Sequence, residues 1–309
     1  MMSDFSKTAP PAPGYEAGME GEHLLLLDRP PPHRAPDAAP RFERSAAPFG
    51  VSVVPVFAAL ARHVDSVCVL EGHAADATRP PALDVLPGTT ATLCITYGPR
   101  VEHAGQTAPS TLSGLFSTTR SYKPMPGIGV VMVTFKPGAL RRFVGAPADA
   151  FAEKNVAAVD LWGSAVASLE DCVASAPDAG TRGALVQRFL VQRLVCTGWD
   201  PLAARIAHAI VDAGGGVSVR AIAAEAGLSE RQLERRFSAA VGLRPKRFAR
   251  LARFARAISL ARTGISWAQV ACASGFSDQS HLTHEFLALV GVPPESFARL
   301  CRVPTSSER

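Results

Sequence analysis

The 309-residue sequence predicts an α+β N-terminal domain, an antiparallel sheet with flanking helices, followed by an all-α C-terminal domain. Three observations support this fold class. Between residues 49 and 160, short apolar runs with period-2 alternation are separated by proline and glycine, as in antiparallel strands. From residue 161 onward, apolar residues recur at helical spacing. Within residues 216–300, one helical unit occurs twice, which indicates an internal duplication.

Residues 1–48 are predicted to form a disordered tail, because they contain nine prolines, many alanines and no sustained hydrophobic period. The four leucines at 24–27 are too few for a signal-peptide core, and no basic segment precedes them. The apolar run at 51–60 is interrupted by Pro55 and is far shorter than the ~20 residues that span a bilayer. We therefore expect a cytoplasmic protein without a membrane segment.

The sheet domain is expected over residues 49–160. It should begin with a short helix at 55–64, because apolar residues recur there at helical spacing. Four strands are then predicted at 65–71, 89–97, 113–122 and 127–135, with turn residues between them. Pro137-Gly138 ends the last strand, and a helix should follow because proline fits a first helical turn.

Two further helices are expected at 160–175 and 181–195, where apolar residues recur at helical spacing. They fall mostly within residues 161–198, which we expect to connect the sheet domain to the C-terminal domain.

The C-terminal domain, residues 201–303, contains GVSVRAIAAEAGLS at 216–229 and GISWAQVACASGFS at 264–277. In each copy a serine can cap a first helix, a glycine ends it, and a second helix follows with two core residues four positions apart. Ser277 is expected to open the second helix of the second copy, with one inserted residue between Gln279 and His281. Helix, glycine turn and helix form a helix-turn-helix motif, expected at 217–238 and 265–287.

The duplicated motif, the P-x-x-F sequence after each copy and the arginine-rich helix between them resemble the DNA-binding domain of AraC/XylS-type transcriptional regulators. The resemblance covers residues 201–302, about a third of the chain. FKPGAL at 135–140 and LWG at 161–163 are similar to poorly characterised N-terminal sensor domains of this family. The resemblance implies a sequence-specific transcription factor whose partners are double-stranded DNA, RNA polymerase in an activator, and a second copy in a homodimer.

The charge distribution favours the same function. Residues 201–303 contain fourteen Arg and Lys against seven Asp and Glu, a net charge of +7, whereas residues 1–200 sum to −2. Six basic residues and no acidic one lie from Arg244 to Arg256. Such a basic surface suits a polyanion, because phosphate neutralisation supplies much of the affinity for DNA. This argues against a helical bundle without a nucleic-acid role.

DNA contacts are predicted on the second helix of each copy, where the resemblance places base contacts. Arg235 is the strongest candidate, because a guanidinium can bond both O6 and N7 of guanine. The second copy has His284 and Leu287 where the family commonly has basic residues, so its affinity for DNA should be weaker and pH-dependent. The predicted contacts are Arg231, Gln232, Glu234 and Arg235 in the first copy, and Gln279, Ser280, His281, Thr283 and His284 in the second.

A linking helix of about seventeen residues is expected at 245–261, roughly 25 Å long at ~1.5 Å per residue. Together with the offsets of the recognition helices, this length could place them about one DNA turn, ~34 Å, apart. Arg250, Arg253 and Arg256 are spaced by three on this helix. Arg250 and Arg253 are predicted to bind DNA phosphates, although Arg253 could instead pair with a carboxylate of its own domain.

The sequence offers little support for an enzyme. It contains no G-x-G-x-x-G, P-loop or G-x-S-x-G motif. Gly214–Gly216 lacks the Lys-Ser/Thr of a phosphate loop and is interpreted as a flexible turn. The histidines of the sheet region, His63, His73 and His103, have neither ligand nor triad spacing to nearby acids. No cofactor or metal is therefore expected, and the pair His281 and His284 is also a weak metal candidate.

The six cysteines are dispersed without a C-x-x-C pair, and each is expected to be a small buried thiol. A DNA-alkylation repair protein with an AraC-like module stays an alternative, but its zinc site would need clustered cysteines. The other alternative is an architectural DNA binder whose first domain only dimerises. The N-terminal domain is expected to sense a small molecule or a protein partner, and sensor pockets have no fixed motif. A small molecule that changes operator affinity or transcription would distinguish these functions.

Overall fold

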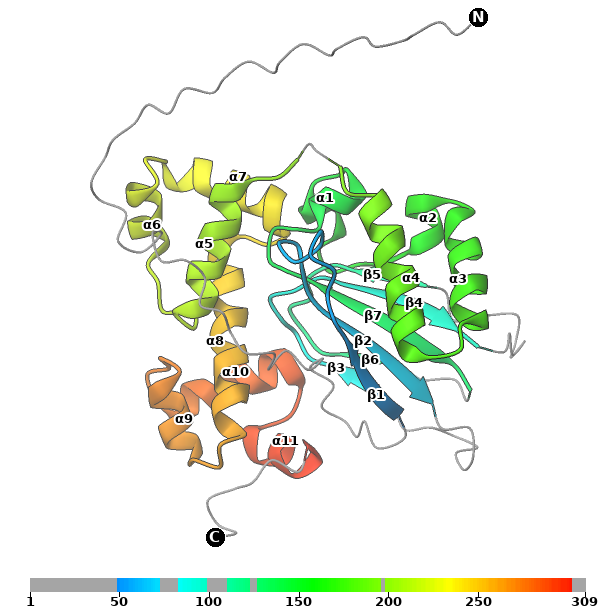
Figure 1. The fold of residues 1–309 in the computed structure, drawn as a ribbon. Coiled ribbons are helices and arrows are strands. Elements are labelled where there is room, and N and C mark those ends of the chain that lie inside the picture. The colour runs from blue at the N-terminus through cyan, green and yellow to red at the C-terminus, as the bar shows by residue number, and fades with distance from the viewer. Residues whose placement is uncertain (1–48, 73–82, 99–109, 123–126, 196–197, 302–309) are drawn as a thin grey trace, which may run out of the picture.

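The computed structural model describes residues 49–72, 83–98, 110–122, 127–195 and 198–301. It has the predicted fold class, with an antiparallel sheet and flanking helices in the N-terminal part and helices alone in the C-terminal part (Figure 1). The tail expected at residues 1–48, together with His73 and His103, lies outside the described residues. Among the described helices, none is both long enough and apolar enough to cross a membrane.

A six-stranded antiparallel sheet forms the centre of the N-terminal part, in the order β1-β2-β7-β4-β5-β8. A separate two-stranded sheet pairs β3 with β6. The strands are β1 (Phe49–Val54), β2 (Val64–Gly72), β3 (Leu83–Val85), β4 (Thr92–Tyr97), β5 (Thr111–Ser113), β6 (Arg120–Tyr122), β7 (Gly129–Phe135) and β8 (Asn155–Ala157).

Two predictions in this part are wrong. Residues 55–64 do not form a helix but a series of turns, in which Leu60 N–H bonds Phe57 O and His63 N–H bonds Leu60 O. The strand predicted at 113–122 is divided into β5 and β6, which belong to different sheets. The chain between them leaves the sheet to contact the C-terminal part. The sequence also does not predict β1, β3 or β8, and two of these are only three residues long.

Helices α3 (Ala165–Ser175) and α4 (Ala179–Gln192) cover one face of the sheet (Figure 1). Gly183 of α4 lies so close to β1 that a Cβ there would be 2.8 Å from Val54 Cγ2. The helix predicted at 160–175 is divided into α2 (Ala158–Trp162) and α3, with Gly163 between them at a positive φ of 60°. The strand residues on the covered face are fully buried, among them Val67, Val69, Leu93, Ile95, Val131 and Val133. Two short elements follow β7, α1 (Arg141–Val144) and the 3₁₀ helix η1 (Ala148–Phe151).

Gln187 joins α4 to the turns that follow β1. Its side chain is fully buried, its Oε1 accepts the Phe57 N–H (2.7 Å) and its Nε2 donates to Pro55 O (3.0 Å). In a helix at 55–64 the Pro55 carbonyl would accept a backbone N–H four residues on, but here it accepts from the Gln187 side chain instead.

We expect Gln187→Leu to lower the free energy of unfolding by about 1–3 kcal/mol, because two backbone groups lose their partners next to an apolar side chain. Urea unfolding measures this loss. Gln192→Leu, at an exposed position of the same helix, is the matched control and should change stability by less than about 0.5 kcal/mol. Equal stability of the two variants would contradict the role of Gln187.

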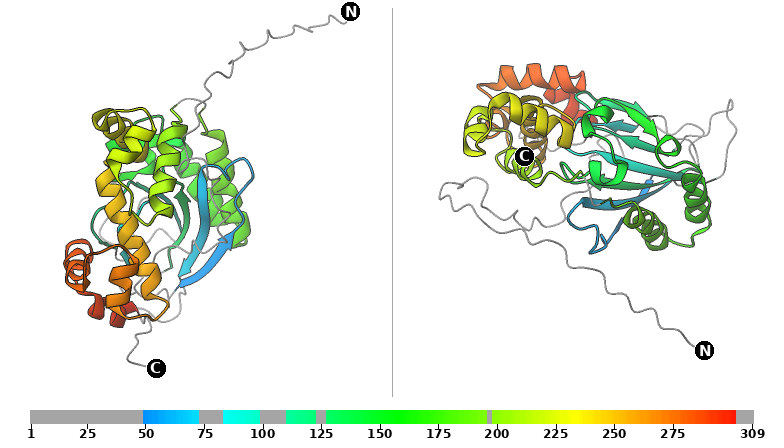
Figure 2. Two further views of the ribbon diagram at one scale, coloured as in Figure 1. Left: turned by 90° about the vertical axis from the view of Figure 1, so that its left-hand side faces the viewer. Right: turned by 90° about the horizontal axis from the view of Figure 1, so that it is seen from above.

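The C-terminal part consists of helices that are arranged around α8 (Figures 1 and 2). α8 joins two helix-turn-helix units, α6–α7 and α9–α10. Phe248 of α8 packs on Phe237 of the first unit (5.4 Å between ring centroids), and Phe254 packs on Phe286 of the second (5.1 Å). The helices are α5 (Pro201–Asp212), α6 (Val219–Glu225), α7 (Glu230–Val241), α8 (Pro245–Ala261), α9 (Trp267–Ala273), α10 (Gln279–Val290) and α11 (Pro294–Cys301).

Four cysteines can be placed within the described residues, and they differ in exposure. Cys68 is fully buried in the sheet and matches the expectation of a buried thiol. Cys94 is only partly buried as a residue, although burial of its thiol raises the pKa to about 12. Cys172 and Cys272 are exposed, so the expectation is wrong for them. Both lie on amphipathic helices, where dispersed spacing in the sequence does not tell the inner face from the outer one.

Candidate nucleic-acid interface

Hydrogen bonds at the helix starts fix the first helix-turn-helix unit. Ser218 Oγ accepts the Ala221 N–H at the start of α6 (3.3 Å). At the start of α7, Ser229 Oγ accepts the Gln232 N–H (3.3 Å), and Gln232 Oε1 accepts the Ser229 N–H (2.9 Å). This reciprocal capping box sets where α7 begins, and it occupies the acceptor of Gln232, one of the predicted DNA contacts.

The face of α7 opposite its core residues presents two of the predicted contacts to solvent. Leu233 and Phe237 are buried, whereas Arg231 and Arg235 are exposed and lie one helical turn apart. Glu234 beside them is partly buried. Within the described part of the chain, no hydrogen bond or ion pair engages either guanidinium, so both can meet a ligand from outside.

Arg236, the next residue along α7, is used differently. Its Nε and Nη2 donate to the Asp200 carboxylate (2.5 and 3.0 Å), and Asp200 also caps α5 by accepting the Ala203 N–H (2.9 Å). Asp200 therefore holds α7 against α5, the first helix of this part. The pair is not predicted from the sequence, although Asp followed by Pro201 is a typical start of a helix.

The Asp200–Arg236 pair predicts an acid dependence. Burial of the Asp200 carboxyl acts to raise its pKa, but the bonds from Arg236 and the Ala203 N–H outweigh it, and the pKa lies below its usual value. Such a carboxylate stabilises the fold above its unfolded pKa of ~3.9, and the contribution is lost as the pH falls through the lower folded value. We expect Asp200→Asn, which can still cap the helix, to flatten the decline of unfolding free energy between roughly pH 5 and 2. An unchanged pH profile would contradict this role.

The second unit begins differently from the prediction. Asp278, not Ser277, caps α10, and its carboxylate accepts the His281 N–H (2.7 Å). Helices α7 and α10 thus start forty-nine positions apart, at Glu230 and Gln279. The inserted residue lies before the helix and not between Gln279 and His281, because the two N-caps, Ser229 and Asp278, are already forty-nine positions apart.

The predicted contacts on α10 fall into two sets. Gln279, Ser280 and His284 are exposed. His281 and Thr283 are partly buried and bonded within the unit. The His281 ring packs edge-on against Phe276 (5.3 Å) with Nδ1 near Ser277 Oγ (3.1 Å), and Thr283 Oγ1 donates to Gln279 O (2.9 Å). The exposed face of α10 therefore carries no arginine, unlike that of α7.

Two arginines of α8 make contacts inside the C-terminal part. Arg250 Nε donates to Glu285 Oε2 of α10 (2.6 Å). Arg253 Nη2 donates to Gly215 O (3.2 Å), so its local partner is a carbonyl, and the local carboxylate binds Arg250 instead. The turn predicted at Gly214–Gly216 is present; Gly214 and Gly215 are buried in it, and Gly215 N–H bonds Ile210 O (2.8 Å).

The described residues contain no cluster of three His, Cys, Asp or Glu side chains that could hold a metal ion. His63 is buried between the rings of Trp199 and Phe143, with centroids 5.0 and 6.1 Å away. Burial, and then the charge of Arg142, lowers its pKa. His63 thus has the surroundings of a neutral core residue.

Two family models match the sequence. Residues 222–300 match a helix-turn-helix domain, and residues 54–157 match a domain of unknown function, DUF6597. The curated proteins contain no match to this chain.

Several solved structures are similar to this chain at low identity. The C-terminal domain of AraT, a response regulator from Geobacillus stearothermophilus, is 18% identical, with 32% of this chain and 85% of that chain covered and a TM-score of 0.31. The xylose-binding transcription activator XylR is 17% identical, with 41% and 39% covered and a TM-score of 0.30. ToxT from Vibrio cholerae O395 is 11% identical, with 82% and 98% covered and a TM-score of 0.39.

Proposed function

We propose that the chain is a DNA-binding transcription regulator that reads two successive major-groove segments with α7 and α10, because a helix-turn-helix domain at residues 222–300 follows a DUF6597 domain at residues 54–157. The observation that carries this proposal is the pair of exposed arginines, Arg231 and Arg235, on the outer face of α7. Arginine can bond guanine through two donors at once, which distinguishes one base from another. Glu234 beside them could accept from cytosine N4.

The second unit would add a weaker subsite. Ser280 and His284 occupy the face of α10 that corresponds to Arg231 and Arg235 of α7, with Gln279 at its start. These side chains carry fewer fixed charges, so binding should rest more on the first unit. Protonation of an exposed histidine would strengthen the second subsite as the pH falls below neutrality.

α8 supports the spacing of the two subsites. It has seventeen residues, so at ~1.5 Å per residue it is roughly 25 Å long. Recognition helices packed at its two ends could then lie about one DNA turn apart. Arg250 and Arg253 would bind phosphates through the guanidinium nitrogens that their described contacts do not use. The net charge of +7 in residues 201–303 favours the same assignment.

Footprinting tests this geometry. We expect one chain to protect two adjacent major-groove segments on the same side of the duplex. Inserting five base pairs between them turns the second segment to the opposite side and should weaken binding by at least about tenfold. A single protected segment, with no effect of the insertion, would exclude a two-segment reading.

The N-terminal part would regulate this binding through a small molecule or a protein partner, and a homodimer or contact with RNA polymerase would be consistent with such a role. An architectural DNA binder is the second candidate. A compound that changes DNA affinity or transcription in the full chain, but not in a variant lacking residues 1–195, which include the sheet and the helices that cover it, would favour the regulator. The absence of any such compound or partner would favour the architectural role.

A further inference from the structure

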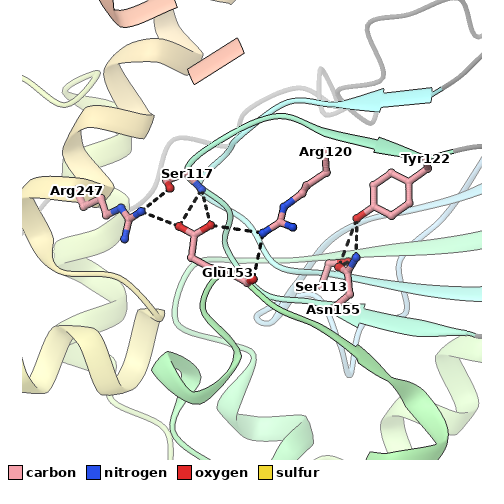
Figure 3. A network of polar contacts seen from close by, with 7 residues as sticks. All are labelled: Ser113, Ser117, Arg120, Tyr122, Glu153, Asn155 and Arg247. Carbon is pink, nitrogen blue, oxygen red and sulfur yellow. Dashed lines mark hydrogen bonds and ion pairs between the residues drawn. The ribbon is translucent and has the colours of Figure 1, made fainter. Parts of the chain in front are cut away.

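The N-terminal part contacts the C-terminal part through residues 114–119, which connect β5 to β6 and which we call the docking segment (Figure 3). Glu153 supports it, because its carboxylate accepts the Ser117 N–H at both oxygens (3.1 and 3.2 Å). Arg247, in the first turn of α8, binds both residues. Its Nη2 lies 2.9 Å from Glu153 Oε1 and also donates to Ser117 Oγ.

The same segment reaches the second helix-turn-helix unit. The N–H and Oγ1 of Thr119 both donate to Leu289 O (2.8 and 3.2 Å). Leu289 lies in the last turn of α10, where carbonyls have no partner within the helix. At the end of α7, a Cβ on Gly242 would be 3.2 Å from Ala148 O of η1. The N-terminal part therefore touches the C-terminal ends of both proposed recognition helices.

Glu153 is held in an unfavourable backbone conformation. Its φ of 59° makes it the single residue other than glycine with positive φ in the described part of the chain. Leu115 O accepts its N–H (3.0 Å), and its own carbonyl accepts from Arg120 Nη2 (3.1 Å). Such conformations persist where the surrounding contacts over-determine them, and they cluster at clamps and switches.

The partners of Arg247 differ in kind from those of its neighbours. Arg236, Arg250 and Arg253 bind Asp200, Glu285 and Gly215, all within residues 200–301. The described partners of Arg247, in contrast, both belong to the N-terminal part. If the docking segment left, the Arg247 guanidinium would be free within the basic run from Arg244 to Arg256. Its contact is exchangeable, because the Arg247 and Glu153 side chains are 48% and 31% exposed and such pairs are weak.

We propose that Glu153 withholds Arg247 from DNA phosphate, so that the docking segment is an intramolecular inhibitor of DNA binding. A phosphodiester offers a guanidinium the same paired-oxygen geometry as a carboxylate, and can replace it. Release of Arg247 loosens the segment, which also frees the ends of α7 and α10. This inference rests on the proposed DNA binding and adds to it a residue, Arg247, and the contact that controls it.

The first test compares Glu153→Gln with Arg247→Gln in the full chain, on a random-sequence duplex. In the wild type, exchanging one ion pair for another changes the salt dependence little. In Glu153→Gln, no ion pair with residue 153 has to break before Arg247 binds phosphate. We therefore expect about fivefold to tenfold tighter binding and a slope of log affinity against log salt that is steeper by about one. Arg247→Gln should gain neither. Glu153→Gln that binds with wild-type affinity and slope, or more weakly, would overturn the proposal.

The second test follows hydrogen exchange at the Thr119 amide, whose acceptor lies on α10. Saturating duplex should accelerate this exchange about tenfold in the wild type, and Glu153→Gln should show the fast rate without DNA. Arg247→Gln should also show the fast exchange rate without DNA. Because Arg247 lies on an exposed helix face, this variant replaces Glu153→Gln in the experiment if Glu153→Gln does not fold. If the wild type binds DNA and the Thr119 exchange rate does not change, the inhibitory contact is excluded, but the proposed DNA binding still stands. A wild type that binds no duplex would reject the proposed function instead.

Discussion

Replacing Gly215 with alanine is expected to lower the free energy of unfolding of the C-terminal part by about 3 kcal/mol or more. The backbone of Gly215 lies against α8, where a Cβ would be 2.1 Å from Ala249 O and 3.0 Å from Arg253 N. Both atoms belong to a helix backbone and cannot turn aside. The φ of +77° at Gly215 adds strain for any other residue, so turn and helix would have to separate.

Gly227→Ala is the matched control. Gly227 has a similar φ of +65°, but no atom lies within 4 Å of the Cβ position, so this variant carries the backbone strain without the collision. We expect it to cost about 1 kcal/mol. Urea unfolding followed by circular dichroism compares the two variants. Similar losses at both positions would show that the close approach of Gly215 to α8 has no energetic weight.

Replacing Arg235 with alanine is expected to remove the preference for one base pair in the first subsite. A bidentate arginine–guanine contact discriminates by about 1–3 kcal/mol, which corresponds to roughly tenfold to more than a hundredfold in relative affinity. Selection of binding sites from a random pool measures it directly. The selected motif of the Arg235→Ala protein should lose a conserved guanine while keeping its other positions.

Arg236→Ala provides the control for this experiment. The residue is adjacent and has the same charge, but its guanidinium is bound to Asp200. We expect an unchanged base preference and lower stability. If instead Arg235→Ala kept the wild-type motif, Arg235 would have no role in base readout.

The helix-turn-helix units could be predicted in detail because their determinants are local. The bond between Ser229 and Gln232 spans three positions, and the core pair Leu233 and Phe237 spans four, so both are visible in the sequence. The start of α10 was harder to place, because Ser277 and Asp278 are both good caps and only the structure shows which one accepts the His281 N–H.

The remaining features depend on residues far apart in the chain. The sequence places Arg247 and Arg250 in one basic run, but it does not show that Glu153 binds one and Glu285 the other. Residues 113–122 are predicted as a single strand, yet the middle of the segment leaves the sheet, where Thr119 bonds Leu289. The positive φ of Glu153 likewise has no local sequence signal, since glutamate rarely adopts it.

The strand order β1-β2-β7-β4-β5-β8 also sets the order in which the chain can fold during synthesis. β7 pairs with both β2 and β4, so the two sides of the sheet cannot join until residue 135 has been made. The covering helices α3 and α4 come later still, and until then the apolar face of the β1–β2 hairpin has no cover from them. Pairings so distant in sequence close slowly, whereas the helical units can each close from local contacts. The N-terminal part is therefore most prone to aggregation while it is still being synthesised.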